Sequence, residues 1–178
     1  MTRCFVGILI PDEIKESILK IQKEIEKLPL KCKIVEKENL HVCFSFLGEV
    51  EDSKIKKIEE KLEEISKNYK KFEVFVDGLK PIPTENYIRV LVLDVIDKEG
   101  YLKPLMKEIV EKIGGNSKPA HLTLCRVKKV ANKQMVKERI KKMELKVGSF
   151  VIDRIQLIKS ELRKTGPIYT VLHECLLQ

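Results

Sequence analysis

Apolar residues recur along the chain in two patterns, one typical of helices and the other typical of strands. Where they are spaced three and four positions apart, they form the single buried stripe of an amphipathic helix. Where they run continuously or alternate with polar residues, they indicate a strand. The first pattern predicts helices over residues 14–28, 55–65, 102–113 and 136–143. The second predicts strands over residues 2–10, 40–47, 72–76, 87–96, 120–127, 150–158 and 168–176, with a short edge strand at 34–35.

Glycine and proline residues indicate where several of these elements end. Asp77-Gly78 is expected to end the strand over residues 72–76, before a turn at Pro81-Ile82-Pro83. Gly114-Gly115 is expected to stop the preceding helix, and Gly166-Pro167 marks the turn before the last strand.

The predicted elements come in the same order twice: strand, helix, strand, helix, strand. This order indicates an internal duplication of about residues 1–80 and 85–178 within a single bilobal domain, residues 1–178. Helices combined with antiparallel strands predict the α+β class. The middle strand of each repeat begins near a histidine, so the two lobes are expected to place these strands face to face.

Each of these two strands carries a small residue two positions after its histidine. Side chains of a strand alternate between its faces, so His41 shares a face with Cys43, and His121 shares one with Thr123. Two of the three histidines in the protein occupy these matched positions. Strict alternation puts Arg126 on the opposite face, so it reaches the same site only if its strand bends or bulges.

Two imidazoles on either side of a substrate suit general acid–base catalysis near neutral pH, because an unperturbed histidine titrates near ~6.5. One ring removes a proton from the nucleophile while the other protonates the leaving oxygen. A phosphodiester fits between them, with Thr123 donating to a non-bridging oxygen and Arg126 neutralising the developing charge. No third ligand accompanies His41 and His121 at a matching spacing, so no metal site is predicted.

The other candidate residues receive mainly structural interpretations. His173 lies in the last strand without a partner motif, and Phe44 and Phe46 are expected in the core. Cys125 shares the predicted face of His121, but nothing near it indicates a nucleophile or ligand. Two interpretations of Tyr169 stay open: a groove aromatic that stacks on a base, or a packed strand residue.

Composition narrows the class of protein. The 35 Lys and Arg outnumber the 27 Asp and Glu, and the formal charge of +8 favours a polyanionic partner, although many lysines alternate with glutamates as on a thermophile's solvated surface. Five cysteines without a C-x-x-C pair predict free cytoplasmic thiols. No segment approaches the ~18 to 20 apolar residues of a membrane span, and the run from Cys4 to Ile10 predicts a first strand, not a signal peptide.

The motifs His41-Val42-Cys43-Phe44 and His121-Leu122-Thr123-Leu124 resemble the paired H-x-T/S-x motifs of the two-histidine (2H) phosphoesterases. The flanks at residues 38–41, 46–49 and 166–169 resemble the RNA 2′,3′-cyclic phosphodiesterase branch, historically called 2′-5′ RNA ligase. This resemblance runs from the first strand to the last. It implies a bilobal fold with two antiparallel sheets flanking a central groove, helices on the outside, and no metal or other cofactor.

The resemblance also implies hydrolysis of RNA 2′,3′-cyclic phosphate ends to 2′-phosphomonoesters, and some members join RNA by ATP-independent 2′-5′ ligation. Carried over by position, His41 would protonate the departing 3′ oxygen and His121 would activate the attacking water. Thr123 and Arg126 would hold the phosphate.

Cys43 departs from the family, in which threonine or serine is expected at this position. A thiol is a poor hydrogen-bond donor, so the departure should weaken catalysis by about 1 to 3 kcal/mol, roughly 5- to 150-fold in rate. Ser45 lies one pleat further along the predicted face of Cys43 as a possible substitute.

The expected partner is RNA with a 2′,3′-cyclic phosphate end, such as a tRNA half. The protein itself is expected to be a cytoplasmic monomer that does not associate with a membrane. Two alternatives stay open. The same chemistry could act on small cyclic nucleotides. Cys43 and the net charge also suit a non-catalytic RNA-end-binding protein, which predicts salt-sensitive binding without turnover.

Overall fold

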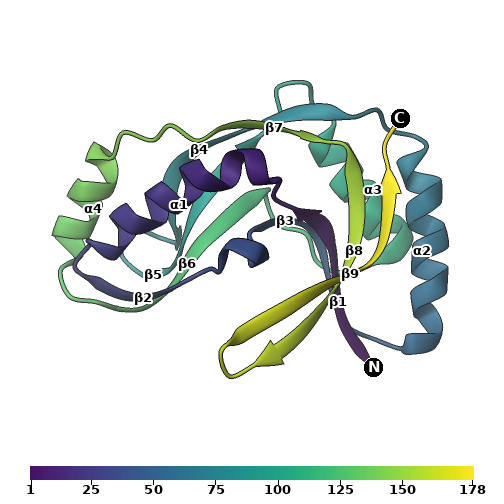
Figure 1. Cartoon of the computed structure of the whole chain (residues 1–178), viewed down its shortest axis with the longest axis horizontal. Coiled ribbons are helices and arrows are strands. Elements are labelled where there is room, and N and C mark those ends of the chain that lie inside the picture. Colours follow the sequence, from purple (N-terminus) through teal and green to yellow (C-terminus); the bar gives the residue numbers. More distant parts are fainter.

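The computed structural model describes all residues, 1–178 (Figure 1). Its strands are β1 (Thr2–Leu9), β2 (Leu30–Ile34), β3 (His41–Val50), β4 (Phe72–Pro83), β5 (Ile88–Ile96), β6 (His121–Val130), β7 (Gly148–Ile152), β8 (Arg154–Arg163) and β9 (Gly166–Leu176). Its helices are α1 (Asp12–Glu26), α2 (Asp52–Ser66), α3 (Leu102–Ile113) and α4 (Lys133–Lys142), with one 3₁₀ turn, η1 (Lys37–Asn39). The four predicted helices are confirmed. No helix is both long and apolar enough to cross a membrane.

The strand predicted over residues 150–158 is wrong, because this segment is divided between two strands. The chain leaves β7 at Ile152 and begins β8 at Arg154. β7 pairs with β4, whereas β8 pairs with β1 and β9. Asp153 therefore marks the point where the chain crosses from one half of the sheet to the other.

The predicted end of a strand at Asp77-Gly78 is also wrong, since β4 continues to Pro83. The pairing of β4 with β5 shifts register between Asp77 and Leu79, and Gly78 adopts a positive φ of 69° there. The glycine thus makes a bulge and not an end. β7 covers β4 only as far as Val76, so the later prolines lie where one edge is free and a missing N–H is tolerated.

The nine strands form one curled antiparallel sheet, in the order β7-β4-β5-β6-β3-β1-β8-β9, with β2 paired to β6. The predicted α+β class is confirmed. The two expected sheets are the two halves of this one sheet, because the pair Val42 and Leu122 joins the histidine strands β3 and β6.

Each half of the sheet has its own helices. Helix α1 contacts β2, β6 and β7, while α2 and α3 pack together and contact β3, β8 and β9. Figure 1 shows α1 and α4 at one end of the molecule and α2 and α3 at the other. Each half of the sheet takes strands from both predicted repeats, β2 and β4 with β5, β6 and β7 in one half, and β1 and β3 with β8 and β9 in the other. The internal duplication stays a prediction.

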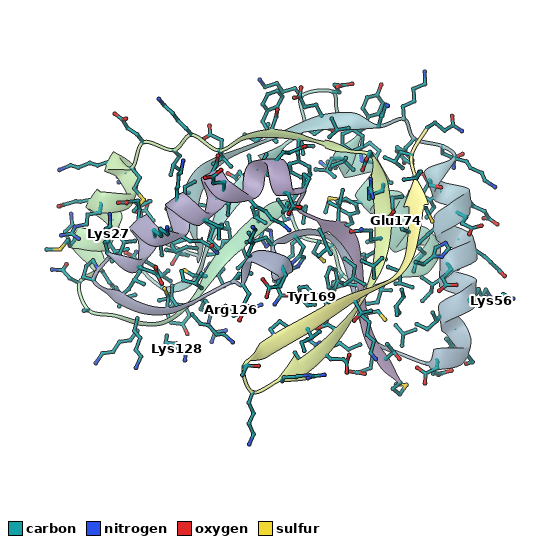
Figure 2. All side chains as sticks on the ribbon, viewed as in Figure 1. Lys27, Lys56, Arg126, Lys128, Tyr169 and Glu174 are labelled. Carbon is teal, nitrogen blue, oxygen red and sulfur yellow. The ribbon has the colours of Figure 1, made fainter.

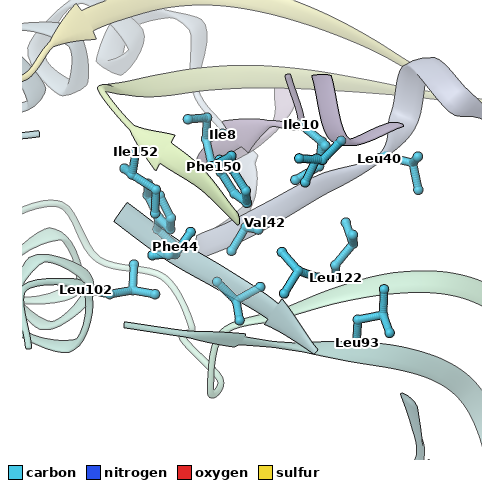
Figure 3. Packing of buried hydrophobic residues seen from close by; sticks show 14 of the residues in the cluster. Ile8, Ile10, Leu40, Val42, Phe44, Leu93, Leu102, Leu122, Phe150 and Ile152 are labelled. Atoms are coloured by element: carbon cyan, nitrogen blue, oxygen red, sulfur yellow. The ribbon is translucent and has the colours of Figure 1, made fainter. Parts of the chain in front are cut away.

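One hydrophobic cluster fills the space between the sheet and the helices of both halves (Figure 3). Val42 and Leu122, which join the halves, are fully buried, as is the predicted core residue Phe44. Burial of each such side chain stabilises the fold by about 1.5 to 3 kcal/mol. The shared core therefore holds β3 and β6 in a set relative position.

Candidate active site

A groove of about 830 Å³ opens where the sheet divides. Strand β6 pairs with β3 only at Leu122 and with β2 from Cys125 onward. β3 and β2 therefore follow one another along the same edge of β6, and the groove lies between them. All the predicted site residues line this groove: His41, Cys43, His121, Thr123, Arg126 and Tyr169.

The two imidazoles have the same orientation relative to their strands. Nδ1 of His41 lies 2.8 Å from the carbonyl oxygen of Asn39, and Nδ1 of His121 lies 2.7 Å from that of Pro119. A carbonyl oxygen only accepts, so each Nδ1 carries the proton and donates it. Nε2 of each ring is consequently free to exchange a proton with a substrate in the groove.

Strands β3 and β6 also contain matching bulges. In β6, Thr123 pairs with Val92 but Cys125 pairs with the preceding Leu91, which leaves Leu124 as an extra residue. A bulge of this kind inverts the alternation of the side chains that follow it. Arg126 therefore lies on the same face of β6 as His121 and lines the groove. The sequence analysis expected this only if the strand bent or bulged, and the bulge is present.

In β3 the same irregularity follows the histidine at the same distance. Cys43 pairs with Gly7 and Ser45 pairs with Val6, which leaves Phe44 as the extra residue. Phe46 therefore occupies in β3 the position that Arg126 occupies in β6, and it lines the groove.

These bulges overturn three predictions based on strict alternation. Phe46 is not in the core, because its side chain is 39% exposed and the Arg3 guanidinium lies 4.8 Å from its ring centre. Ser45 is fully buried and donates to the carbonyl of Gly114, so it cannot take the place of Cys43 in the groove. Cys125 is buried away from the groove face of His121.

Gln22 of α1 supports the β6 bulge and was missed by the sequence interpretation. Its buried Nε2 donates to the carbonyl oxygens of Leu124, at 3.0 Å, and Val35, at 2.9 Å. Leu124 is the extra residue of the bulge. The available signal was an amide beside the apolar stripe of α1, which includes Ile18 and Ile21.

We expect Gln22→Met to destabilise the protein by about 2 kcal/mol, because it removes the side-chain donor from the carbonyl of Val35 and leaves that of Leu124 with only the backbone N–H of Val35. KM should rise as well, since Arg126 loses the support of its bulge. Urea unfolding and steady-state kinetics measure the two effects. The matched control is Gln134→Met on α4, where the amide bonds only to the exposed Glu138. Equal stability and KM in the two variants would contradict a role for Gln22.

Aromatic side chains enclose the ring of His41. Its centre lies 4.7 Å from that of Phe5 and 5.1 Å from that of Tyr169, which meets it edge-on. This burial lowers the pKa of His41, and the nearby His121 and Arg126 lower it further, against the opposing effect of the Asn39 carbonyl. Tyr169 thus packs against the histidine and also lines the groove.

Cys43 lines the groove as a neutral thiol. Burial raises the pKa of Cys43 to about 11, so it carries no negative charge near neutral pH. It is therefore a weak donor beside His41, whereas Thr123 presents a hydroxyl at the matching position beside His121.

The groove carries an excess of positive charge. Arg3, Lys33, Lys118 and Arg126 line it, and Glu36 contributes the one carboxylate, which lies 3.6 Å from Lys33 Nζ. A groove lined in this way attracts anions such as phosphates. The structure brings together no group of three or more His, Cys, Asp or Glu side chains that could hold a metal ion.

Hydrogen bonds hold the hairpin of β8 and β9 at one end of the groove. The buried side chain of Asn39 donates to the carbonyl of Pro167 at 2.9 Å, and Lys33 Nζ donates to that of Thr165 at 2.6 Å. These bonds hold the start of β9, which carries Tyr169, against His41. Asn39 thus positions His41 with its own carbonyl and the hairpin with its side chain.

His173 takes no part in the groove. Its Nε2 lies 3.1 Å from a carboxylate oxygen of Glu63 on α2, at a different face of the molecule. This contact is consistent with its structural interpretation.

Comparisons with known proteins point to one family, and the whole-protein comparisons cover nearly all of the chain. The family model "LigT like Phosphoesterase" matches residues 8–92. A protein of Methanocaldococcus jannaschii named RNA 2′,3′-cyclic phosphodiesterase is 37% identical, over 97% of this chain and 99% of its own. One of the same name from Methanothermobacter thermautotrophicus is 30% identical, over 94% and 95%. A crystal structure of a Thermus thermophilus protein has a TM-score of 0.80 at 22% identity, covering 98% of this chain and 97% of that one.

Proposed function

Because the chain belongs to the LigT-like phosphoesterase family, we propose that it hydrolyses RNA 2′,3′-cyclic phosphate ends to 2′-phosphomonoesters. The names of its relatives support this activity. The observation that carries the proposal is the matched pair of imidazoles, each with Nδ1 bonded to a carbonyl and Nε2 free in a positively charged groove.

In the proposed reaction, Nε2 of His121 takes a proton from water as the water oxygen attacks the phosphorus. The bond from phosphorus to the 3′ oxygen breaks, and protonated His41 gives its Nε2 proton to that oxygen. The assignment of His41 as the acid follows the family resemblance. Its lowered pKa makes the imidazolium a stronger proton donor but also leaves less of it protonated near neutral pH. Thr123 donates to a non-bridging oxygen, and Arg126 neutralises the charge that develops in the transition state.

The test is turnover of a short RNA ending in a 2′,3′-cyclic phosphate, in the presence of EDTA. Phosphorus NMR distinguishes a 2′-phosphate product from a 3′-phosphate, and we expect only the former. Salt-sensitive binding without turnover would instead identify an RNA-end-binding protein. Turnover restricted to cyclic mononucleotides would identify small cyclic nucleotides, and not RNA ends, as the substrate.

Cys43→Thr should accelerate this hydrolysis by roughly 5- to 150-fold, because a hydroxyl replaces a poor donor beside the phosphate. Thr123→Cys should slow it by a similar factor. Single-turnover rates on the same RNA measure both effects. Cys43→Ala serves as the control for side-chain volume and should resemble the wild type. If the wild type, Cys43→Thr and Cys43→Ala all react equally fast, the side chain at this position makes no hydrogen bond to the transition state.

We also propose that the protein acts as a cytoplasmic monomer on the ends of tRNA halves, and that it can join such ends by a 2′-5′ bond. A single chain supplies both histidines, so the site needs no second copy. Its five cysteines are unpaired, as suits a reducing compartment. Light scattering measures the mass in solution, and incubation with paired tRNA halves tests both hydrolysis and joining.

A further inference from the structure

Basic side chains continue from the groove along β2 and β6. We call this set the basic ribbon, which consists of Lys31, Lys33, Arg126, Lys128 and Lys129. Lys33 and Arg126 line the groove, whereas the other three lie beyond its lining and are exposed. The ribbon is thus one surface that begins inside the site and leaves it.

The pairing of β2 with β6 puts these charges on one face of the sheet. Lys33 lies opposite Arg126, and Lys31 lies opposite Lys129. Residues paired across two strands share a face, as do residues two apart along a strand, so both pairs face the groove side.

Between these pairs, Cys32 lies opposite Val127, and both pack against the hydrophobic core. The register shifts between Lys31 and Cys32, which leaves Lys128 as an extra, exposed residue of β6. The ribbon therefore has an apolar side that anchors it and a charged side that faces outward. Figure 2 shows Arg126 and Lys128 along the rim of β6.

The charge of the ribbon is almost uncompensated. Lys31, Arg126, Lys128 and Lys129 form no ion pair, and Lys33 pairs only with Glu36. Some lysines elsewhere pair with a carboxylate three or four positions away in the helical segments. Examples are Lys15 with Asp12, Lys54 with Glu51 and Lys112 with Glu108. The ribbon therefore brings five basic side chains together on two paired strands with one carboxylate beside them.

We propose that the basic ribbon binds the phosphates of the RNA strand that precede the cyclic end. This inference rests on the proposed function. Arg126 belongs to both surfaces, so a strand leaving the site past this residue meets Lys33 and then Lys31 and Lys129. Residues three positions apart along β6 are separated by about 10 Å, which suits roughly two or three successive phosphates. The ribbon thus selects a polynucleotide over a cyclic mononucleotide.

The experiment compares Lys31→Gln/Lys129→Gln with the matched control Lys56→Gln/Lys57→Gln, which removes two equally exposed charges from α2. Each variant is assayed on a 12-nucleotide RNA ending in a 2′,3′-cyclic phosphate and on a 2′,3′-cyclic mononucleotide. The ribbon variant should raise KM for the RNA about tenfold and leave the mononucleotide kinetics unchanged. It should also reduce the dependence of log kcat/KM on log salt by about 1.4, since two phosphate contacts are lost. The control should change none of these quantities.

Equal RNA kinetics and equal salt dependence in the ribbon variant and the control would overturn the inference. Hydrolysis of the RNA by the wild type would still support the proposed function in that case. If the wild type hydrolyses neither substrate, the proposed function fails on its own. Binding of a fluorescent RNA with a 3′-phosphate then tests the ribbon separately. Weaker binding by the ribbon variant than by the control supports the ribbon, and equal binding overturns it.

Discussion

We expect that replacing either His41 or His121 with alanine will abolish hydrolysis of 2′,3′-cyclic phosphate RNA and leave the protein folded. Each imidazole moves one proton in the proposed reaction, and the loss of a positioned acid or base reduces rates by typically 10²- to 10⁴-fold. Both rings are only partly buried, and neither joins the hydrophobic cluster. Product analysis over long incubations measures the loss, and circular dichroism with thermal unfolding checks the fold.

His173→Ala is the matched control, because it removes the third histidine, which contacts Glu63 away from the groove. Its turnover should equal that of the wild type. Turnover within tenfold of wild type in the His41 or the His121 variant would rule out paired-histidine catalysis.

Replacing Gly7 with alanine should destabilise the protein by about 3 kcal/mol and reduce turnover strongly. A Cβ atom at Gly7 would lie 2.3 Å from the carbonyl oxygen of Val42 and 3.2 Å from Cα of Cys43. Both are backbone atoms of β3, so β1 and β3 would have to move apart. His41 lies on the moved strand, and a displacement of about 1 Å at a catalytic group can reduce the rate roughly 10²-fold.

Gly100→Ala is the control for this substitution. Nothing lies within 4 Å of a Cβ built at Gly100, and only its positive φ of 83° is unfavourable for alanine. We expect it to cost about 1 kcal/mol and to leave turnover unchanged. Urea unfolding and kcat measurements on both variants make the comparison. If Gly7→Ala is no less stable and no less active than Gly100→Ala, β1 and β3 do not approach as closely at this point.

The helices and the histidine strands could be predicted because their signals are local. The stripe of Ile14, Ile18, Ile21 and Ile25 is buried in α1 as its spacing indicated. The division of residues 148–163 into β7 and β8 could not be predicted in this way, because only the pair Asp153-Arg154 interrupts the apolar residues at the division and neither glycine nor proline marks an end there. It depends on which distant strand each part meets, β4 or β1.

The members of the site divide in the same way. His41, Cys43, His121 and Thr123 precede the bulges, and alternation from the start of each strand places them correctly in the groove. Beyond the bulges, alternation from the start of the strand gives the wrong face. Arg126 lines the groove although alternation excludes it, and Ser45 and Cys125 are buried although alternation places them in the groove.

The sequence by itself therefore determined the class of fold, most of the elements and the pair of histidines that line the groove, since periodicity and a repeated motif are properties of short segments. Only the tertiary structure decided that the two halves form one sheet and that the residues beyond Thr123 change faces. The physical reason is that strand register depends on partners far along the chain. For β6 these are β5, which sets the bulge, and Gln22 of α1, which satisfies the carbonyl of Leu124.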